Sequence, residues 1–188
     1  MIAPLEDLRH DHRLIERVIA VLERASQQID AGEEVSPDTL EQAREFVRGF
    51  ADGCHHAKEE HALFPALSAK NPAIEFGPVR VLTEDHDAGR MLMADLEVAI
   101  GLMRRGDAGG ALAARKAMVT YTHMLRRHIA KEEEILFPLS DGLLTEADAE
   151  ALTEQFEHVE HETGPGAHER FEALVAELES AVGIKAAA

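Results

Sequence analysis

The residues best suited to chemistry are histidines and glutamates that recur in a duplicated motif. Residues 55–65 read HHAKEEHALFP and residues 128–138 read HIAKEEEILFP, so both follow the pattern H-x-A-K-E-E-x-x-L-F-P. An acidic residue followed by histidine precedes each copy, as Asp11-His12 and Asp85-His86. The chain therefore carries two copies of one arrangement, with a His on a first segment and His-x-x-x-Glu on a second.

The spacing within each motif brings two metal-binding side chains to one point. Residues four apart on an α-helix lie on the same face, one turn from each other. A buried, ionised glutamate is costly unless it is paired or bound to a metal ion. The duplicated pattern therefore predicts a metal site inside a helical protein, with four imidazoles and two carboxylates from His12, His55, Glu59, His86, His128 and Glu132.

The ligand types narrow the choice of metal. Cys54 is the only cysteine and lies outside the repeated positions, so a zinc site built from thiolates is excluded. Imidazole and carboxylate suit iron, zinc or manganese, and two carboxylates able to bridge suit a pair of ions. No Glu in the chain is followed by His three residues later, which argues against the Glu-x-x-His pairs of ferritin-like sites.

Two carboxylates facing each other in a bundle also predict an electrostatic cost. Like charges at close range raise the pKa of one carboxyl and oppose folding, and bound metal cancels them. We therefore expect removal of the metal to destabilise the protein.

One histidine beside a predicted ligand is an alternative ligand. His56 follows His55, but the repeat aligns His55 with His128 and His56 with Ile129. This alignment favours His55 as the ligand and leaves His56 as the alternative.

Other residues near the motif are expected to have structural roles. Glu60 and Glu133 would be the ligands if the register were shifted by one residue, but their side chains are expected to face solvent. Those of His10 and His123 are expected to lie on the bundle surface or beside the ligands. Phe64 and Phe137 are expected to pack the end of the bundle, and Cys54 to be a small core residue.

Helix signals account for the whole chain, and strand-like alternation is missing. Apolar periodicity, Gly and Pro breaks and capping residues such as Ser36-Pro37 and Thr145 predict helices over about 5–31, 37–67, 79–105, 107–137, 145–163 and 167–182. The prediction is an all-α protein, with an antiparallel four-helix bundle over residues 1–140 and a C-terminal helical extension over 141–188 packed on it.

Composition limits the possible partners. The net charge is −17, which repels phosphate backbones and anionic lipid, so neither nucleic acid nor a membrane surface is an expected partner. A lone cysteine carries no sign of an oxidising compartment, and the N-terminus lacks the pattern of a secretory signal. We expect a cytoplasmic protein.

The motif order H…H-x-x-x-E…H…H-x-x-x-E, with L-F-P after each pair, resembles the hemerythrin-like HHE cation-binding family, in particular its bacterial members. The resemblance covers roughly residues 5–140. It implies a four-helix bundle holding two iron ions, bridged by the two carboxylates and an oxo or hydroxo group, with the six repeated residues as ligands. Oxygen-carrying relatives have a further His one turn beyond the third-helix ligand, where this chain has Arg90.

The predicted ligand set leaves the metal site open. Two six-coordinate ions with these six ligands and a bridging oxygen retain two positions for O2, NO, peroxide or another side chain. His168 is a candidate for one of them, since the segment from Gly164 to Glu169 resembles a closing helix found in many relatives. The resulting hypothesis is a non-haem di-iron protein that binds or reacts with O2, NO or peroxide, and a structural or iron-storage metal protein is the alternative.

Overall fold

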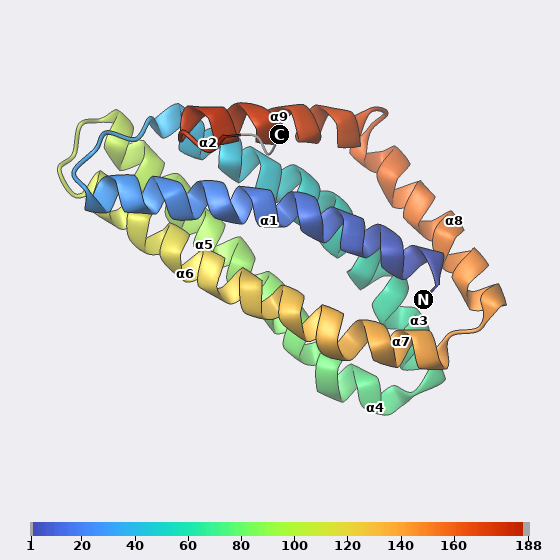
Figure 1. Ribbon diagram of the computed structural model, residues 1–188. Helices are drawn as coiled ribbons and strands as arrows, with labels where there is room; N and C mark the ends of the chain where they lie inside the picture. Colours follow the sequence, from blue (N-terminus) through green and yellow to red (C-terminus); the bar gives the residue numbers. More distant parts are fainter. Residues whose placement is uncertain (1, 186–188) are drawn as a thin grey trace.

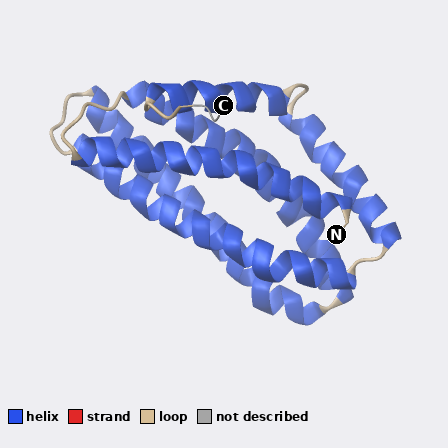
Figure 2. Ribbon diagram, in the orientation of Figure 1, coloured by secondary structure: helices blue, strands red, loops and turns tan. Residues whose placement is uncertain are grey.

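The computed structural model describes residues 2–185, and every regular element in this range is helical. No strand occurs among these residues (Figure 2). The all-α prediction is therefore confirmed.

The helical segments follow the predicted ones, with two differences, and are interrupted by wider, π-helical turns. Residues 72–78, which the prediction leaves outside the helices, form short helical turns, and the segment predicted to end at about residue 137 continues to Leu143. Their bounds are α1 Ala3–Asp30, α2 Pro37–Phe46, η1 Val47–His56, η2 Glu59–Leu63, α3 Phe64–Lys70, α4 Pro72–Ile74, η3 Glu75–Val79, α5 Arg80–Arg104, α6 Gly110–Lys131, η4 Glu132–Leu136, α7 Phe137–Leu143, α8 Glu146–Thr163 and α9 Ala167–Ala181. Both predicted caps are present: the Ser36 side chain accepts a hydrogen bond from the Asp38 backbone N–H, and Thr145 and Asp148 form a capping box.

Four long segments run beside one another in alternating directions (Figure 1). They are α1, the continuous stretch from α2 to α3, α5, and the stretch from α6 to α7. α1 packs against α2 and α6, and α5 packs against the same two helices. This arrangement fits the antiparallel four-helix bundle that the sequence predicts.

The last two helices pack on this group. α8 crosses one end of the molecule, and α9 returns along α1 and α2 (Figure 1). The approach of α9 is close: a Cβ added to Gly49 would lie 2.6 Å from the Phe171 ring. Phe171 is almost fully buried, so α9 completes the core on this side.

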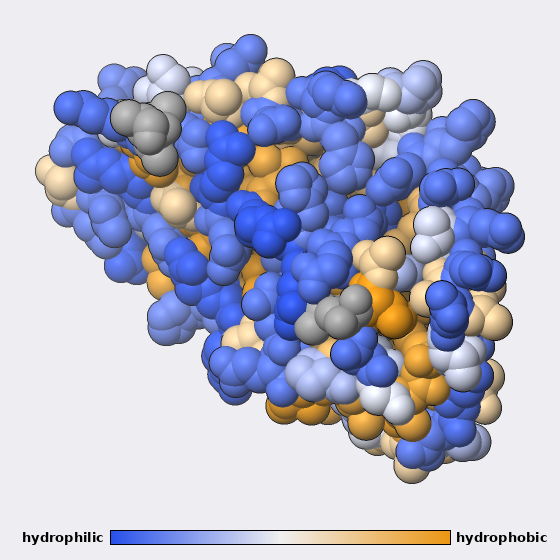
Figure 3. Space-filling model, turned by 45° about the vertical axis from the view of Figure 1, so that its right-hand side comes forward, coloured by the Kyte–Doolittle hydropathy of each residue, from blue (hydrophilic) through white to orange (hydrophobic). Residues whose placement is uncertain are grey.

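The core consists of two apolar clusters with polar residues between them. Along α1, Leu8 belongs to one cluster and Ile15 to the other, and the buried Asp11 and His12 lie between. Hydrophilic side chains cover most of the face in Figure 3. None of the helices among residues 2–185 is long and apolar enough to cross a membrane.

The π-helical turns η2 and η4 occupy equivalent places in the two copies of the motif. Each lies just before the proline of L-F-P, Pro65 or Pro138. A proline ring clashes with the carbonyl four residues earlier and donates no hydrogen bond, and a wider turn relieves that clash. The prolines thus account for wide turns that begin at Glu59 and Glu132.

Candidate metal centre

The structure brings together the six residues of the duplicated motif. His12 comes from α1, His55 and Glu59 from the η1 and η2 turns, His86 from α5, and His128 and Glu132 from the junction of α6 and η4. All six are at most 1% exposed. Each long segment therefore contributes an imidazole or an imidazole with a carboxylate to the interior.

The ligand atoms form two overlapping groups. Atoms of His12, His55 and Glu132 lie within 4.8 Å of one another, and so do atoms of Glu59, His86, His128 and Glu132. Glu132 belongs to both groups, since its Oε2 lies 3.0 Å from His12 Nε2 and its Oε1 lies 3.0 Å from His128 Nε2.

Glu59 lies opposite with a similar double role. Its Oε2 is 3.4 Å from His86 Nε2 and 3.9 Å from His55 Nε2. Glu59 is fully buried, yet neither of its carboxylate oxygens accepts a hydrogen bond from the described residues. A buried carboxylate without a donor calls for a cation, so this donor set fits bound metal.

Carboxylates outside the two groups hold the Nδ1 atoms of the imidazoles. Glu60 Oε1 lies 2.6 Å from His86 Nδ1, and Glu133 Oε1 lies 3.0 Å from His12 Nδ1. Glu60 and Glu133 are partly exposed, as expected, with 24% and 40% of their side chains accessible, but each also contacts a ring nitrogen, which the sequence pattern does not predict. Such partners orient a metal-binding imidazole with Nε2 toward the ion.

The aspartates before His12 and His86 serve the other two imidazoles. Asp11 Oδ2 lies 3.4 Å from His55 Nδ1, and Asp85 Oδ2 lies 3.5 Å from His128 Nδ1. Both aspartates pair in turn with the lysine of the motif, Asp11 with the fully buried Lys58 and Asp85 with Lys131. The signal was present in the sequence, because the D-H and K-E-E segments are duplicated together with the ligands.

The motif phenylalanines pack on the imidazoles. Phe137 stacks on His12 with ring centroids 5.5 Å apart, and Phe64 stacks on His86 at 5.9 Å. Both phenylalanines are buried at the end of the bundle. They pack that end, as the sequence predicts, and also cover the imidazoles.

His56 lies inside the protein with His55, against the expectation from the repeat. Its ring stacks on His86 at 3.8 Å, and its ring nitrogen forms a third group with those of His86 and His128. Its Nδ1 lies 3.3 Å from Asp52 Oδ1, and its Nε2 has no hydrogen-bond partner among the described residues. The counterparts of these two residues in the other copy, His128 and Ile129, are both buried as well, so each copy turns two adjacent side chains inward and the alignment alone does not exclude His56.

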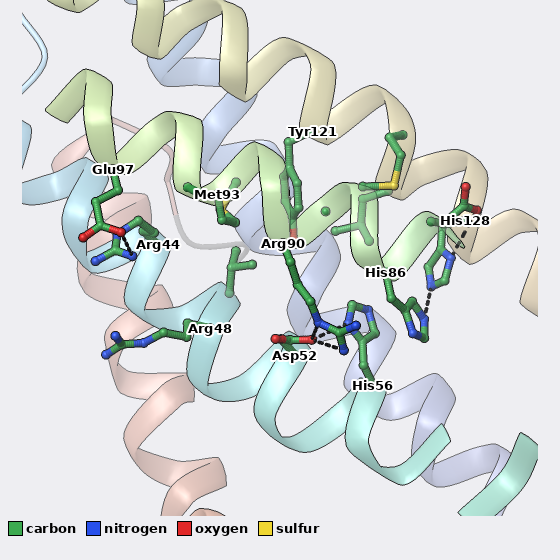
Figure 4. Close-up of a pocket in the computed structure, with 16 residues that line it drawn as sticks. Arg44, Arg48, Asp52, His56, His86, Arg90, Met93, Glu97, Tyr121 and His128 are labelled. Atoms are coloured by element: carbon green, nitrogen blue, oxygen red, sulfur yellow. Dashed lines mark hydrogen bonds and ion pairs between the residues drawn. The ribbon is translucent and has the colours of Figure 1, made fainter. Parts of the chain in front are cut away.

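Arg90 connects two of the outer carboxylates. Its guanidinium lies 2.7 Å from Asp52 Oδ1 (Figure 4). It also lies 2.8 Å from Glu60 Oε1. Asp52 in turn contacts His56, and Glu60 contacts His86. Arg90 therefore helps to hold the imidazoles of His56 and His86 in place. It occupies the position at which oxygen-carrying relatives have a fifth histidine.

His168 lies outside the groups of converging ligand atoms. Its Nε2 is 3.4 Å from Glu160 Oε1 and 3.9 Å from Asp11 Oδ1, and a third of its side chain is exposed. His10 and His123 are exposed on the surface, and Cys54 is buried in the core. His168 thus lies beside Asp11, and Asp11 in turn contacts the Nδ1 atom of His55.

Charges in the metal-free site are balanced by protons on histidine. Burial lowers the pKa of His128, but the Glu132 charge and the contact with Asp85 outweigh it and raise that pKa to about 10. Burial raises the pKa of Glu132, but His128 and His12 hold it well below its usual range. The expected rise of a carboxyl pKa is therefore wrong for Glu132, because the imidazoles of His12 and His128, each 3.0 Å from one of its oxygens, stabilise its charge.

His56 differs from these imidazoles. The pKa of His56 is lowered to about 3, chiefly by burial and also by the neighbouring imidazoles of His86, His55 and His128. The contact with Asp52 acts in the opposite direction but does not offset them. A neutral imidazole has a free lone pair, which is the form that binds a metal ion.

Comparisons with known proteins agree with the site. The family model for the hemerythrin HHE cation-binding domain matches residues 3–140. Proteins of Mycobacterium tuberculosis and Mycobacterium bovis, both named only as uncharacterised, are 23% identical to this chain over 180 residues, covering 95% of it and 70% of each relative. No solved structure matches the chain at a significant level.

Proposed function

The chain belongs to the hemerythrin HHE cation-binding family, and on that premise we propose a non-haem di-iron protein that binds or reacts with O2, NO or peroxide. The observation that carries the proposal is the position of Glu132, with one oxygen at His12 and the other at His128. A carboxylate shared in this way suits two neighbouring ions rather than one. The proposal places the di-iron centre in a four-helix bundle over residues 1–140, and treats residues 141–188 as an added helical extension.

Seven residues form the proposed ligand set. His12 and His55 would hold one ion, and His56, His86 and His128 would hold the other. Glu59 and Glu132 would be shared by both ions, together with an oxo or hydroxo group. His56 enters this set because its Nε2 lacks another partner and groups with His86 and His128. In this proposal His56 is the fifth imidazole ligand. Oxygen-carrying relatives have their fifth histidine at another position, where this chain has Arg90.

This set would leave one open position, on the ion held by only two imidazoles. Two six-coordinate ions that share five imidazoles, two carboxylates and one oxygen would have a single place left, on the side of His12 and His55. When bound, the irons supply a place for a small ligand and electrons for its reduction. The surrounding residues orient the imidazoles through Asp11 and Glu133 and cover them with Phe137.

Rapid mixing of the reduced, iron-loaded protein with O2, NO and hydrogen peroxide tests the function. We expect at least one of them to change the optical spectrum within seconds. The matched comparison is His10→Ala, which alters an exposed histidine on the same helix as His12 and should react like the unaltered protein. A protein that keeps two irons and fails to react with all three would support the alternative, a structural or iron-storage role.

A further inference from the structure

A cavity lies between the α2–η1 segment, α5 and α6, beside the candidate metal centre. Its volume is about 240 Å³. An engineered apolar cavity of about 150 Å³ is enough to hold benzene. The cavity is therefore large enough for a small organic molecule.

The two ends of the cavity differ (Figure 4). At one end, Arg44 and Glu97 form an ion pair of 3.0 Å. At the other end lie His86 and His128, with His56 nearby. His12 and His55 do not line it, so the cavity is separate from the position proposed for the small ligand on their ion.

Most of the surface that faces the cavity is apolar, although charged residues also line it. Val47 extends from one side, Met93 from the second, and Met124 and Leu125 from the third. An occupant with an apolar body would be transferred from water to a matching surface, which favours binding.

Apart from the imidazoles of the candidate metal centre, the wall has one buried polar group without a hydrogen-bond partner in the described protein. Tyr121 is 2% exposed, and its hydroxyl makes no hydrogen bond to any described residue. Burial raises the pKa of this hydroxyl, so it stays protonated and able to donate. Buried hydroxyls are nearly always hydrogen-bonded, so this one suits an acceptor on an occupant.

The charges around the cavity argue for a neutral occupant. The guanidinium of Arg90 already binds Asp52 and Glu60, and that of Arg44 binds Glu41 and Glu97. Arg48 also lines the cavity and has no ion-pair partner among the described residues, but its side chain is exposed, so water screens its attraction for an anion. A charged ligand in the buried part of the cavity would lose its hydration without meeting an unpaired opposite charge there.

We propose that this cavity binds a small, uncharged, largely apolar organic molecule whose hydroxyl or carbonyl oxygen accepts a hydrogen bond from Tyr121. The site is a second binding site of the protein, next to the imidazoles of one ion and away from the open position on the other. An occupant there contacts the His56 and His86 side of the centre.

Two probes of the same shape test this site: benzyl alcohol, which carries the oxygen, and ethylbenzene, which carries a methyl group in its place. Calorimetric titration of the metal-loaded protein should detect both, with benzyl alcohol the tighter. Tyr121→Phe should weaken benzyl alcohol about fivefold to tenfold, the effect of one hydrogen bond of about 1 kcal/mol, and leave ethylbenzene unchanged.

Two substitutions on α5 locate the binding. Ala94 lines the cavity and is exposed, so Ala94→Trp should block the entrance and abolish the binding of both probes. Val98→Trp, at a position 65% exposed and outside the cavity, should leave both unchanged. No detectable binding, binding that survives Ala94→Trp, or equal effects of Tyr121→Phe on both probes would each overturn the proposal.

Discussion

The ring of His56 stacks on that of His86, with centroids 3.8 Å apart and planes inclined by 14°. The two residues belong to different copies of the repeat, and only His86 has a counterpart in the other copy, His12. The pairing makes the two halves of the centre unequal, with three imidazoles on one side and two on the other.

The first prediction concerns His56. His56→Ala removes one imidazole from the three-histidine side, so we expect less than two metal ions per chain after reconstitution and gel filtration. Added imidazole should restore the second ion, because the shortened side chain leaves room for it beside the cavity. The exposed His61 of the same segment gives the control, His61→Ala. Full occupancy and an unchanged spectrum in His56→Ala would remove His56 from the ligand set.

The second prediction concerns the carboxylates that hold Nδ1 atoms. Glu60→Gln and Glu133→Gln keep the shape of the side chain but weaken the contact with His86 or His12. Loss of such a partner typically lowers metal affinity about 10- to 100-fold, which competition with a chelator would measure. Glu134→Gln, an exposed position beside Glu133, should retain the original affinity. Equal affinities in all three variants would mean that the outer carboxylates do not support the ligands.

The third prediction concerns pH and the metal-free protein. The pKa of His128 is raised to about 10, against about 6.5 in an unfolded chain. A raised pKa adds stability that is complete below about pH 6.5 and is lost as the pH rises toward 10. Urea unfolding of the metal-free protein should therefore show lower stability at pH 9 than at pH 6.

The metal-loaded protein provides the comparison for this pH effect. Bound metal replaces the protons on the imidazoles, so its stability should depend less on pH over the same interval. His168 contributes in the same direction, since contacts with Cys54 and Glu160 raise its pKa to about 10. The comparison should be repeated in His168→Gln, and a metal-free protein that is more stable at pH 9 would contradict the account.

The fourth prediction concerns the C-terminal helix. Phe171 of α9 packs against Phe46 and Phe50, with ring centroids 5.7 Å apart in each pair. Phe171→Ala should lower the free energy of unfolding by about 3–5 kcal/mol. Phe76→Ala removes a ring that is 75% exposed and should cost far less. Similar losses in the two variants would show that α9 is not part of the core.

Much of the site could be predicted because the motif that carries its residues occurs twice in the chain. In each copy the His and Glu of the second segment are four residues apart, which places them on one face of a helix. The six duplicated residues can therefore be identified from the sequence alone. Glu60 and Glu133 are duplicated as well, which suggests that both have the same role. To show that this role is contact with an imidazole requires their distances to His86 and His12, which lie on other segments of the chain.

His56 shows where the sequence argument fails. Both copies bury two adjacent side chains, His55 and His56 in one and His128 and Ile129 in the other. The repeat therefore does not decide whether His56 reaches the centre, which depends on where α5 and α6 place His86 and His128. The position of His168 likewise depends on how α9 packs against α1 and α2, which no local pattern specifies.

Anomalous X-ray diffraction at the iron edge, from crystals of the anaerobically reconstituted protein, tests the central claim most directly. Our account predicts two iron peaks per chain, one beside His12 and His55 and one beside His56, His86 and His128, with Glu59 and Glu132 contacting both. A single peak in the middle of these residues, or two peaks that do not share Glu132, would contradict it.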